Sequence, residues 1–252
     1  MTPDDADEVT DALAAAHRTA TPVSPDGFPR IDSLADGYRV QERLIARLSD
    51  RRGNPIGYKI GFTNQRVQAD LGVAEPGYGR LLADTLARSP ATIRLDEYVG
   101  LRVEPEIVFR LGSDLSADAS RTATRGAISA VVPAVELVDS RTDWRFDAPL
   151  AVADNCLDAG IVVGDDAAPN GRSTSTESVT LRVDGEAVAS GAGDEVLGDP
   201  LAALAWLAET AGGLPAGALV STGSLTEPLA VEPEETVTAA FASLGAVELR
   251  VR

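Results

Sequence analysis

Apolar residues near the start of the chain recur with the spacing of a helix. From Ile31 to Leu48 they lie mostly three or four residues apart, and Asp32 or Ser33 can act as the N-cap. Over residues 56–62 the pattern changes to alternation, with Ile, Tyr, Ile and Phe separated by Gly, Lys and Gly. We predict a helix, then a strand, then a short helix up to residue 71 and a glycine-rich loop over residues 72–80.

Strand patterns predominate from about residue 91. Apolar or alternating runs cover residues 91–95, 101–111 and 128–138, and Asp184 with Gly185 marks a hairpin. A helix is predicted from Pro200, and the last residues form a closing hairpin. This order predicts an α+β fold, with an N-terminal helical lobe over residues 1–90 and a strand-rich body over residues 91–252, which together can form one domain.

Three carboxylates are the candidate metal ligands. Alternation over residues 101–111 places Glu104 and Glu106 on one face of a strand, about 7 Å apart at the backbone. Glu136 lies within an apolar run, where an isolated charge is costly unless it is paired or bound to a cation. Carboxylates on a strand can equally be a solvated face, but Glu136 favours a site for a hard ion such as Mg²⁺ or Mn²⁺.

Lys59 is the only lysine in the sequence. Gly57 and Gly61 flank it on the same face of the predicted strand, which would let a substrate approach its ammonium group closely. The alternative is a surface lysine whose stem lies on apolar groups. Asp84 ends a short apolar segment and can be either a turn residue or a participant in the chemistry.

Composition and charge exclude several classes of protein. The chain has 252 residues, 44% hydrophobic and 24% charged, as globular proteins have. Its net charge of −17 repels phosphate backbones and anionic lipids, so we expect neither a nucleic-acid nor a membrane partner. One cysteine and one histidine exclude an intrachain disulfide and a histidine-rich metal site. The acidic start lacks the basic region of a signal peptide, so we expect a cytoplasmic protein.

Eight segments follow one another in a characteristic order from residue 57 to the C-terminal part. They are GYKIGFT at 57–63, QADLGV at 68–73, LAD at 82–84, RVEPEI at 102–107, VELVDSR at 135–141, VADN at 152–155, GDPL through WL at 198–207 and TGSLT at 222–226. Together they resemble the 2-keto-4-pentenoate hydratase and 4-oxalocrotonate decarboxylase branch of the fumarylacetoacetate hydrolase family.

The resemblance implies a mixed β-roll or sandwich body. It also implies a divalent metal, Mg²⁺ or Mn²⁺, held by Glu104, Glu106 and Glu136, and a lysine, Lys59, beside a bound 2-oxo acid. Pro105 departs from the small residue expected between the first two ligands, and it removes a backbone donor, which predicts an edge strand or a bulge.

We therefore expect a metal-dependent lyase, a hydratase of a small 2-hydroxy-dienoate or 2-oxo acid such as 2-hydroxypenta-2,4-dienoate, of the kind used in aromatic catabolism. The alternatives are a decarboxylase of a 4-oxalocrotonate-like 2-oxo diacid and a non-catalytic partner subunit. We expect a homo-oligomer and a complex with a pathway decarboxylase, hydratase or aldolase.

Further residues receive roles in this scheme. Lys59 would neutralise the substrate, and Asp84 is the first candidate acid or base. A decarboxylase must also hold a second substrate carboxylate, for which Arg102 and Arg141 are the candidates. The residues expected to position substrate or water are Asp154, Asn155, Ser140 and Ser224.

The single histidine and the single cysteine receive structural interpretations. His17 has no acid one turn further on, which disfavours hydrolytic water activation, and it is interpreted as a surface residue of the first helix. Cys156 has no histidine evidently placed to activate it, so we expect a small buried side chain rather than a nucleophile.

Overall fold

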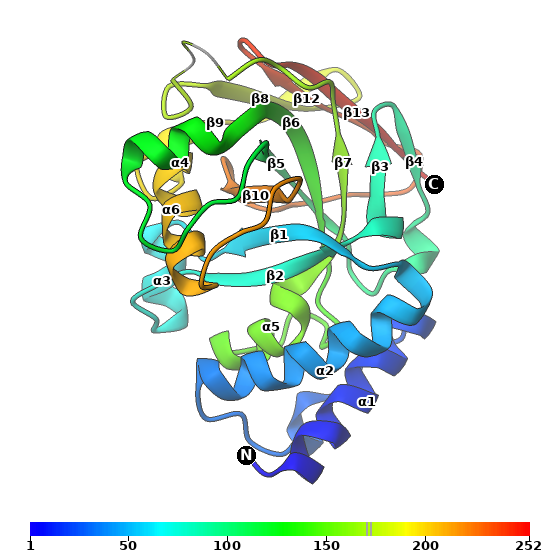
Figure 1. Cartoon of the computed structure of the whole chain (residues 1–252). Coiled ribbons are helices and arrows are strands. Elements are labelled where there is room, and N and C mark those ends of the chain that lie inside the picture. The colour runs from blue at the N-terminus through cyan, green and yellow to red at the C-terminus, as the bar shows by residue number, and fades with distance from the viewer. Residues whose placement is uncertain (170, 172) are drawn as a thin grey trace.

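The computed structural model describes residues 1–169, 171 and 173–252. Three helices, α1 (Pro3–Thr19), α2 (Leu34–Arg52) and α5 (Ala148–Ala153), pack together below the strands in Figure 1. Buried apolar side chains, including Leu13 and Leu44, form the core between them. The helical lobe predicted at the start of the chain is present, and α5 from the middle of the chain completes it.

Local signals define the ends of these helices. Thr2 and Asp5 form a capping box at the start of α1, and Ser33 caps α2 through the backbone of Asp36. Gly53 follows α2 with φ 75°, a conformation that favours glycine. Of the two predicted caps, Asp32 and Ser33, the structure shows Ser33, and the helix begins at residue 34.

The larger sheet of the described residues has eight strands. Its order is β2-β1-β10-β5-β6-β7-β3, and β11 pairs with β5. These strands are β1 (Pro55–Gly61), β2 (Gly77–Leu82), β3 (Leu86–Arg88), β5 (Arg102–Leu111), β6 (Ile128–Val138), β7 (Asp158–Val163), β10 (Leu219–Ser224) and β11 (Leu229–Ala230). Strands from residues 55–88 therefore lie in the same sheet as those of the later body.

A second sheet, of five strands in the described chain, has the order β4-β13-β12-β8-β9. Its strands are β4 (Ala91–Ile93), β8 (Ser178–Val183), β9 (Glu186–Ala192), β12 (Thr236–Phe241) and β13 (Gly245–Val251). Three further helices are α3 (Gln65–Leu71), α4 (Arg121–Ala127) and α6 (Pro200–Thr210). The short 3₁₀ turns are η1 (Pro25–Gly27), η2 (Ala83–Thr85), η3 (Leu95–Glu97), η4 (Asn155–Leu157) and η5 (Gly193–Glu195).

The two faces of β5 meet different environments. Ile107 and Phe109 belong to the main core together with Val237 and Leu249 of the second sheet. On the other face, Val108 belongs to a smaller apolar cluster whose members come from β2, β5, β6, β7 and β10. The larger sheet therefore curls on itself and encloses that face, which gives the expected mixed β-roll. No helix in the described part of the chain is long and apolar enough to cross a membrane.

Two local predictions differ from the structure. The loop predicted over residues 72–80 ends earlier, because Gly77–Leu82 forms β2 and pairs antiparallel with β1. Pro105 lies in an interior strand, so the edge-strand alternative is wrong. The bulge alternative fits better, since the register of β10 against β5 shifts between Ser221 and Ser224, opposite the residues that follow Pro105.

Candidate metal and substrate site

Pairing between β5 and β6 brings three glutamates together. Glu104 lies directly opposite Glu136 in the register, and Glu106 lies two residues further along β5. One carboxylate oxygen from each of the three lies within 4.8 Å of the others. The side chains face the enclosed side of the roll, and Glu136 is 0% and Glu106 1% exposed. The face predicted from alternation is therefore the one that carries the cluster.

Burial and the neighbouring carboxylates disfavour the ionised form of Glu104 and Glu136. Burial raises the pKa of Glu104 to about 7, an effect that Lys59 opposes and Glu106 reinforces. Burial likewise raises the pKa of Glu136 well above its usual range. Neither Glu136 oxygen accepts a hydrogen bond from the described residues. Buried oxygens without a hydrogen-bond partner, in an all-carboxylate set, are the donors that a hard divalent cation requires.

The third glutamate is fixed by β10. Ser221 donates a hydrogen bond to Glu106 Oε2 at 2.5 Å, and the Gly223 backbone N–H donates to the same oxygen at 3.0 Å. Sequence reasoning did not identify Ser221. Alternation along β10 could have indicated it: Leu219 and Ser221 share the enclosed face of the strand, while Val220 packs in the main core.

Lys59 lies beside the glutamates and is 3% exposed. Its Nζ is 3.1 Å from Glu136 Oε1 and donates a hydrogen bond to the Cys156 carbonyl at 2.9 Å. Burial alone would lower the pKa of Lys59, but Glu136 and the neighbouring carboxylates raise it overall, so the ammonium stays charged. The surface-lysine alternative is therefore wrong.

The glycines around Lys59 serve the fold rather than the substrate. A Cβ at Gly57 would lie 2.0 Å from the Leu219 carbonyl oxygen, and one at Gly61 would lie 2.8 Å from Cys156 Sγ. The space beside Lys59 is thus taken by the chain itself, which corrects the expectation of an open approach. Cys156 is buried, as predicted.

The η4 turn supplies the carbonyl that binds Lys59. Asn155, Cys156 and Leu157 have φ of 52°, 52° and 64°, a left-handed run that costs free energy for each non-glycine residue. The Asn155 side chain anchors the turn, because its Oδ1 accepts from Arg80 N at 2.7 Å and its Nδ2 donates to Arg80 O at 2.9 Å. Gly79 allows this contact, since a Cβ there would lie 2.2 Å from Asn155 O. Asn155 therefore shapes the site wall through its side-chain amide.

Asp154 and Arg141 form a separate buried cluster with His17. Arg141 Nε donates to both Asp154 carboxylate oxygens at 2.8 and 3.0 Å, and its backbone N–H donates to Oδ2. His17 Nε2 lies 3.0 Å from Oδ1. His17 is 7% exposed, so its interpretation as a surface residue is wrong. The reason is that the end of α1 packs over the residues leading into η4.

The pKa values in this cluster follow from burial and the two cations. Burial lowers the pKa of His17 to about 4, helped by Arg141, so His17 is neutral at pH 7 and donates to Asp154. Burial would raise the pKa of Asp154, but Arg141 and His17 lower it overall. Arg141 also donates to the Asp154 and Asp158 carbonyls. Its guanidinium is committed within the protein, which corrects its expected role in substrate binding.

Three expected site residues lie apart from the glutamates or are engaged elsewhere. Asp84 is exposed in η2 beside Gly53, because the chain turns away from the roll after β2. It does not join the cluster. Ser224 donates to the Thr226 carbonyl at 2.7 Å, and buried Ser140 lies 3.1 Å from the Thr142 hydroxyl.

Asp158, at the start of β7, carries a carboxylate that the sequence analysis gave no role. It is buried, and its Oδ1 has no hydrogen-bond partner among the described residues. Burial raises the pKa of Asp158 to about 6, while the charge of Lys59 limits the rise. A carboxyl group that titrates near neutrality can hold or release a proton.

The curled sheet encloses three glutamates and a buried lysine. Together they form an acid-rich site suited to a divalent cation and an anionic substrate, as in a metal-dependent enzyme. The family model described as fumarylacetoacetate (FAA) hydrolase C-terminal matches residues 63–252. The chain belongs to the fumarylacetoacetate hydrolase family.

The relatives of this chain include hydratases and decarboxylases. The chain is 35% identical to 2-keto-4-pentenoate hydratase of Paraburkholderia xenovorans over 98% of this chain and 95% of that protein. It is 34% identical to 4-oxalocrotonate decarboxylase of a Pseudomonas species over 85% of this chain and 86% of that protein. The structure matches 4-oxalocrotonate decarboxylase from Pseudomonas putida G7, complexed with magnesium and adipate, with a TM-score of 0.92 at 27% identity, covering 100% of this chain and 99% of that one. The resemblance drawn from the eight segments is thus confirmed.

Proposed function

We propose that the protein is a divalent-metal-dependent lyase that hydrates a small 2-hydroxy-dienoate, such as 2-hydroxypenta-2,4-dienoate, through its 2-oxo form. The observation that carries this proposal is the trio of Glu104, Glu106 and Glu136 beside Lys59, in which Glu104 is half-buried and the other two are buried. Both Glu136 oxygens lack a hydrogen-bond partner in the described chain. The hydratase and decarboxylase relatives support it.

The residues present fit Mg²⁺ or Mn²⁺. Glu104, Glu106 and Glu136 would hold the ion, and a relative with the same fold is complexed with magnesium. When bound, the cation supplies Lewis-acid stabilisation of negative charge on the substrate's carboxylate and 2-oxygen. Ser221 and Gly223 hold the Glu106 carboxylate in place for this role.

Lys59 provides the positive charge of the protein itself. Because its ammonium is buried and fixed by Glu136 and the Cys156 carbonyl, it is preorganised to neutralise a substrate carboxylate or enolate. Asp158 replaces Asp84 as the candidate acid or base, because it is buried, has a free oxygen in the described structure and has its pKa raised to about 6 by burial. Asp154 and Asn155 hold the η4 turn, which supplies the Cys156 carbonyl to Lys59 and leads into Asp158.

The contacts of Arg102 and Arg141 favour hydration over decarboxylation of a diacid. A diacid substrate needs a cation for its second carboxylate. Arg141 is engaged with Asp154 and two carbonyls, and the Arg102 guanidinium lies 3.7 Å from the centre of the Trp144 ring. The decarboxylase stays the second candidate because of the relatives with that activity.

The test supplies 2-hydroxypenta-2,4-dienoate and 2-oxo-3-hexenedioate separately to the purified protein with Mg²⁺ or Mn²⁺. Loss of the dienol absorbance reports hydration, and a coupled assay reports carbon dioxide. We expect hydration, its loss after exhaustive chelation, and its return when metal is restored. A higher kcat/KM for carbon dioxide release would establish the decarboxylase instead, and full activity without metal would refute the metal-dependent mechanism.

We also propose that the protein is a cytoplasmic homo-oligomer and that it associates with a decarboxylase, hydratase or aldolase of the same pathway. The family relationship supports this part of the proposal. Light scattering on the protein alone and co-purification with such an enzyme test it. Turnover by the isolated chain would also exclude the role of a non-catalytic partner subunit.

A further inference from the structure

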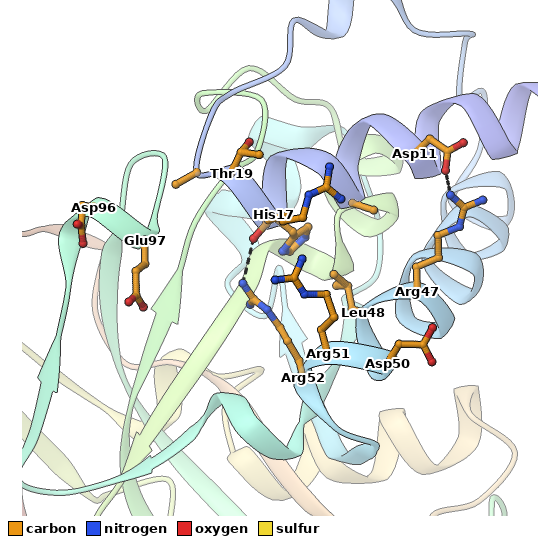
Figure 2. Close-up of a pocket in the computed structure, with 13 residues that line it drawn as sticks. Asp11, His17, Thr19, Arg47, Leu48, Asp50, Arg51, Arg52, Asp96 and Glu97 are labelled. Carbon is orange, nitrogen blue, oxygen red and sulfur yellow. Dashed lines mark hydrogen bonds and ion pairs between the residues drawn. The ribbon is translucent and has the colours of Figure 1, made fainter.

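A surface groove of about 780 Å³ lies on the helical lobe, away from the glutamate cluster. It is formed by the last turns of α1 and α2 and by the η3 turn, and we call it the α1–α2 groove (Figure 2). Its charged lining residues are Asp11, Arg18, Arg47, Asp50, Arg51, Arg52, Asp96 and Glu97, and the neutral His17 also lines it. None of the roles proposed above uses it.

Some charged residues of the groove form ion pairs and others do not. Arg47 forms an ion pair with Asp11, as Figure 2 shows. Across the groove, Asp96 and Glu97 both pair with Arg94, at 2.7 and 3.4 Å.

Three guanidinium groups of the described lining remain without an ion pair. Arg18, Arg51 and Arg52 have no carboxylate in ion-pair contact among the described residues. The lining as a whole holds four arginines and four carboxylates, so the positive charge is local to these three side chains. The groove therefore concentrates unpaired guanidinium groups in a protein whose net charge is −17.

Arg52 is the most buried of the three arginines. Its guanidinium is partly buried at the base of the groove and donates to a neutral acceptor, the His17 carbonyl, at 3.1 Å. Burial lowers the pKa of Arg52 and the charge of Arg141 lowers it further, while Tyr98 and Asp158 oppose the shift. A partly desolvated cation with no carboxylate in ion-pair contact is unfavourable, and an anion in the groove would relieve that cost.

We propose that the α1–α2 groove binds a small dianion, such as phosphate or a short dicarboxylate, through Arg18, Arg51 and Arg52. Guanidinium groups match the paired oxygens of both anions. Arginines near a helix C-terminus also offset the helix dipole, but that effect acts on each helix separately. It does not account for the convergence of two helix ends on one groove.

The test measures binding of inorganic phosphate and of succinate, each alone, to the full-length metal-loaded protein by calorimetry at constant ionic strength. The test variant is R18Q with R51Q, two exposed arginines without a described side-chain partner. The matched control is R88Q with R250Q, which also removes two exposed arginines but lies on β3 and β13. We expect the test variant to weaken binding of at least one probe by about tenfold or more, and the control to leave it within twofold.

Each other result overturns the proposal. Equal weakening in both double variants would show a general effect of net charge. Unchanged affinity in the test variant would place the anion elsewhere, including in the metal site, and absence of saturable binding of both probes would leave the groove without a ligand of this class. The inference is independent of the proposed lyase activity, because the readout is binding and not turnover.

Discussion

Two clusters of buried charge adjoin η4, and they differ in how completely their hydrogen bonds are satisfied. Both Asp154 oxygens accept hydrogen bonds from Arg141, and Oδ1 also lies within hydrogen-bond distance of His17 Nε2. Neither Glu136 oxygen accepts one from the described residues, although Lys59 lies nearby. Both clusters are enclosed, so burial alone does not separate them.

The difference indicates what each cluster is for. A buried carboxylate that is fully hydrogen-bonded holds its surroundings in place, whereas one whose oxygens accept no hydrogen bond stays costly until a ligand satisfies it. The pKa values diverge accordingly, since that of Asp154 is lowered overall and that of Glu136 is raised. We interpret the His17 cluster as the support for η4 and the Glu136 cluster as the reactive site.

The largest expected effect comes from removing one charge in the unsatisfied cluster. Glu136→Gln keeps the side-chain shape but removes a ligand charge, so we expect kcat/KM to fall by roughly 10³ or more and metal affinity to fall measurably. Calorimetry and steady-state assays check this. The matched change, Asp154→Asn, should instead lower the free energy of unfolding by about 3 kcal/mol. Unchanged metal affinity in Glu136→Gln would break the comparison.

Lys59→Met tests the cation of the same cluster. Methionine nearly preserves the volume of the side chain, so we expect a folded protein whose kcat/KM is lower by about 10². Metal affinity should be retained or increased, because a positive charge beside Glu136 is gone. Near wild-type turnover with an unchanged near-UV circular dichroism spectrum would show that Lys59 serves only the fold.

The glutamate cluster was largely predictable because it depends on local patterns. Alternation along β5 placed Glu104 and Glu106 on one face, and the apolar flanks of Glu136 indicated its burial. The register that sets Glu104 opposite Glu136 is a tertiary contact, so the alternation could suggest the cluster but could not establish it. Helix caps and hairpin turns were predictable for the same local reason.

The contacts within the supporting cluster were not predictable from local patterns. His17 and Asp154 are 137 residues apart in sequence, and the contact depends on how α1 packs over the body. A local signal did exist, since His17 continues the buried stripe of Val9 and Leu13 on α1. The position of Asp84 could not be deduced either, because a single 3₁₀ turn after β2 decides which way its carboxylate points.

His17→Gln tests the supporting cluster through the pH dependence of folding stability. Burial lowers the pKa of His17 to about 4, so between pH 6.5 and 4 the unfolded chain binds a proton that the folded protein does not. Folded-state stability should therefore fall on acidification through this window, by up to about 3 kcal/mol from this group.

Glutamine can still donate to Asp154 but does not titrate, so the variant should lose about 1 kcal/mol at pH 7. Its deficit should shrink or reverse at pH 4.5. Urea unfolding of both proteins at the two pH values gives the change in the free energy of unfolding with pH for each. An equal change in both proteins would mean that His17 does not carry this dependence. The kcat/KM of the variant at pH 7 should stay within a few-fold of wild type.

A further small effect is expected at the junction between the two clusters. A Cβ at Gly61 would lie 2.8 Å from Cys156 Sγ and 3.7 Å from Lys59 Nζ, so Gly61→Ala should displace η4 slightly. We expect a loss of about 1 to 2 kcal/mol in stability and about fivefold in kcat/KM. Gly126→Ala, where the added methyl meets nothing within 4 Å, is the matched control and should be neutral. Adding Cys156→Ala to Gly61→Ala removes the clashing sulfur and should restore most of the activity; if it does not, the contact between β1 and η4 is not what aligns Lys59.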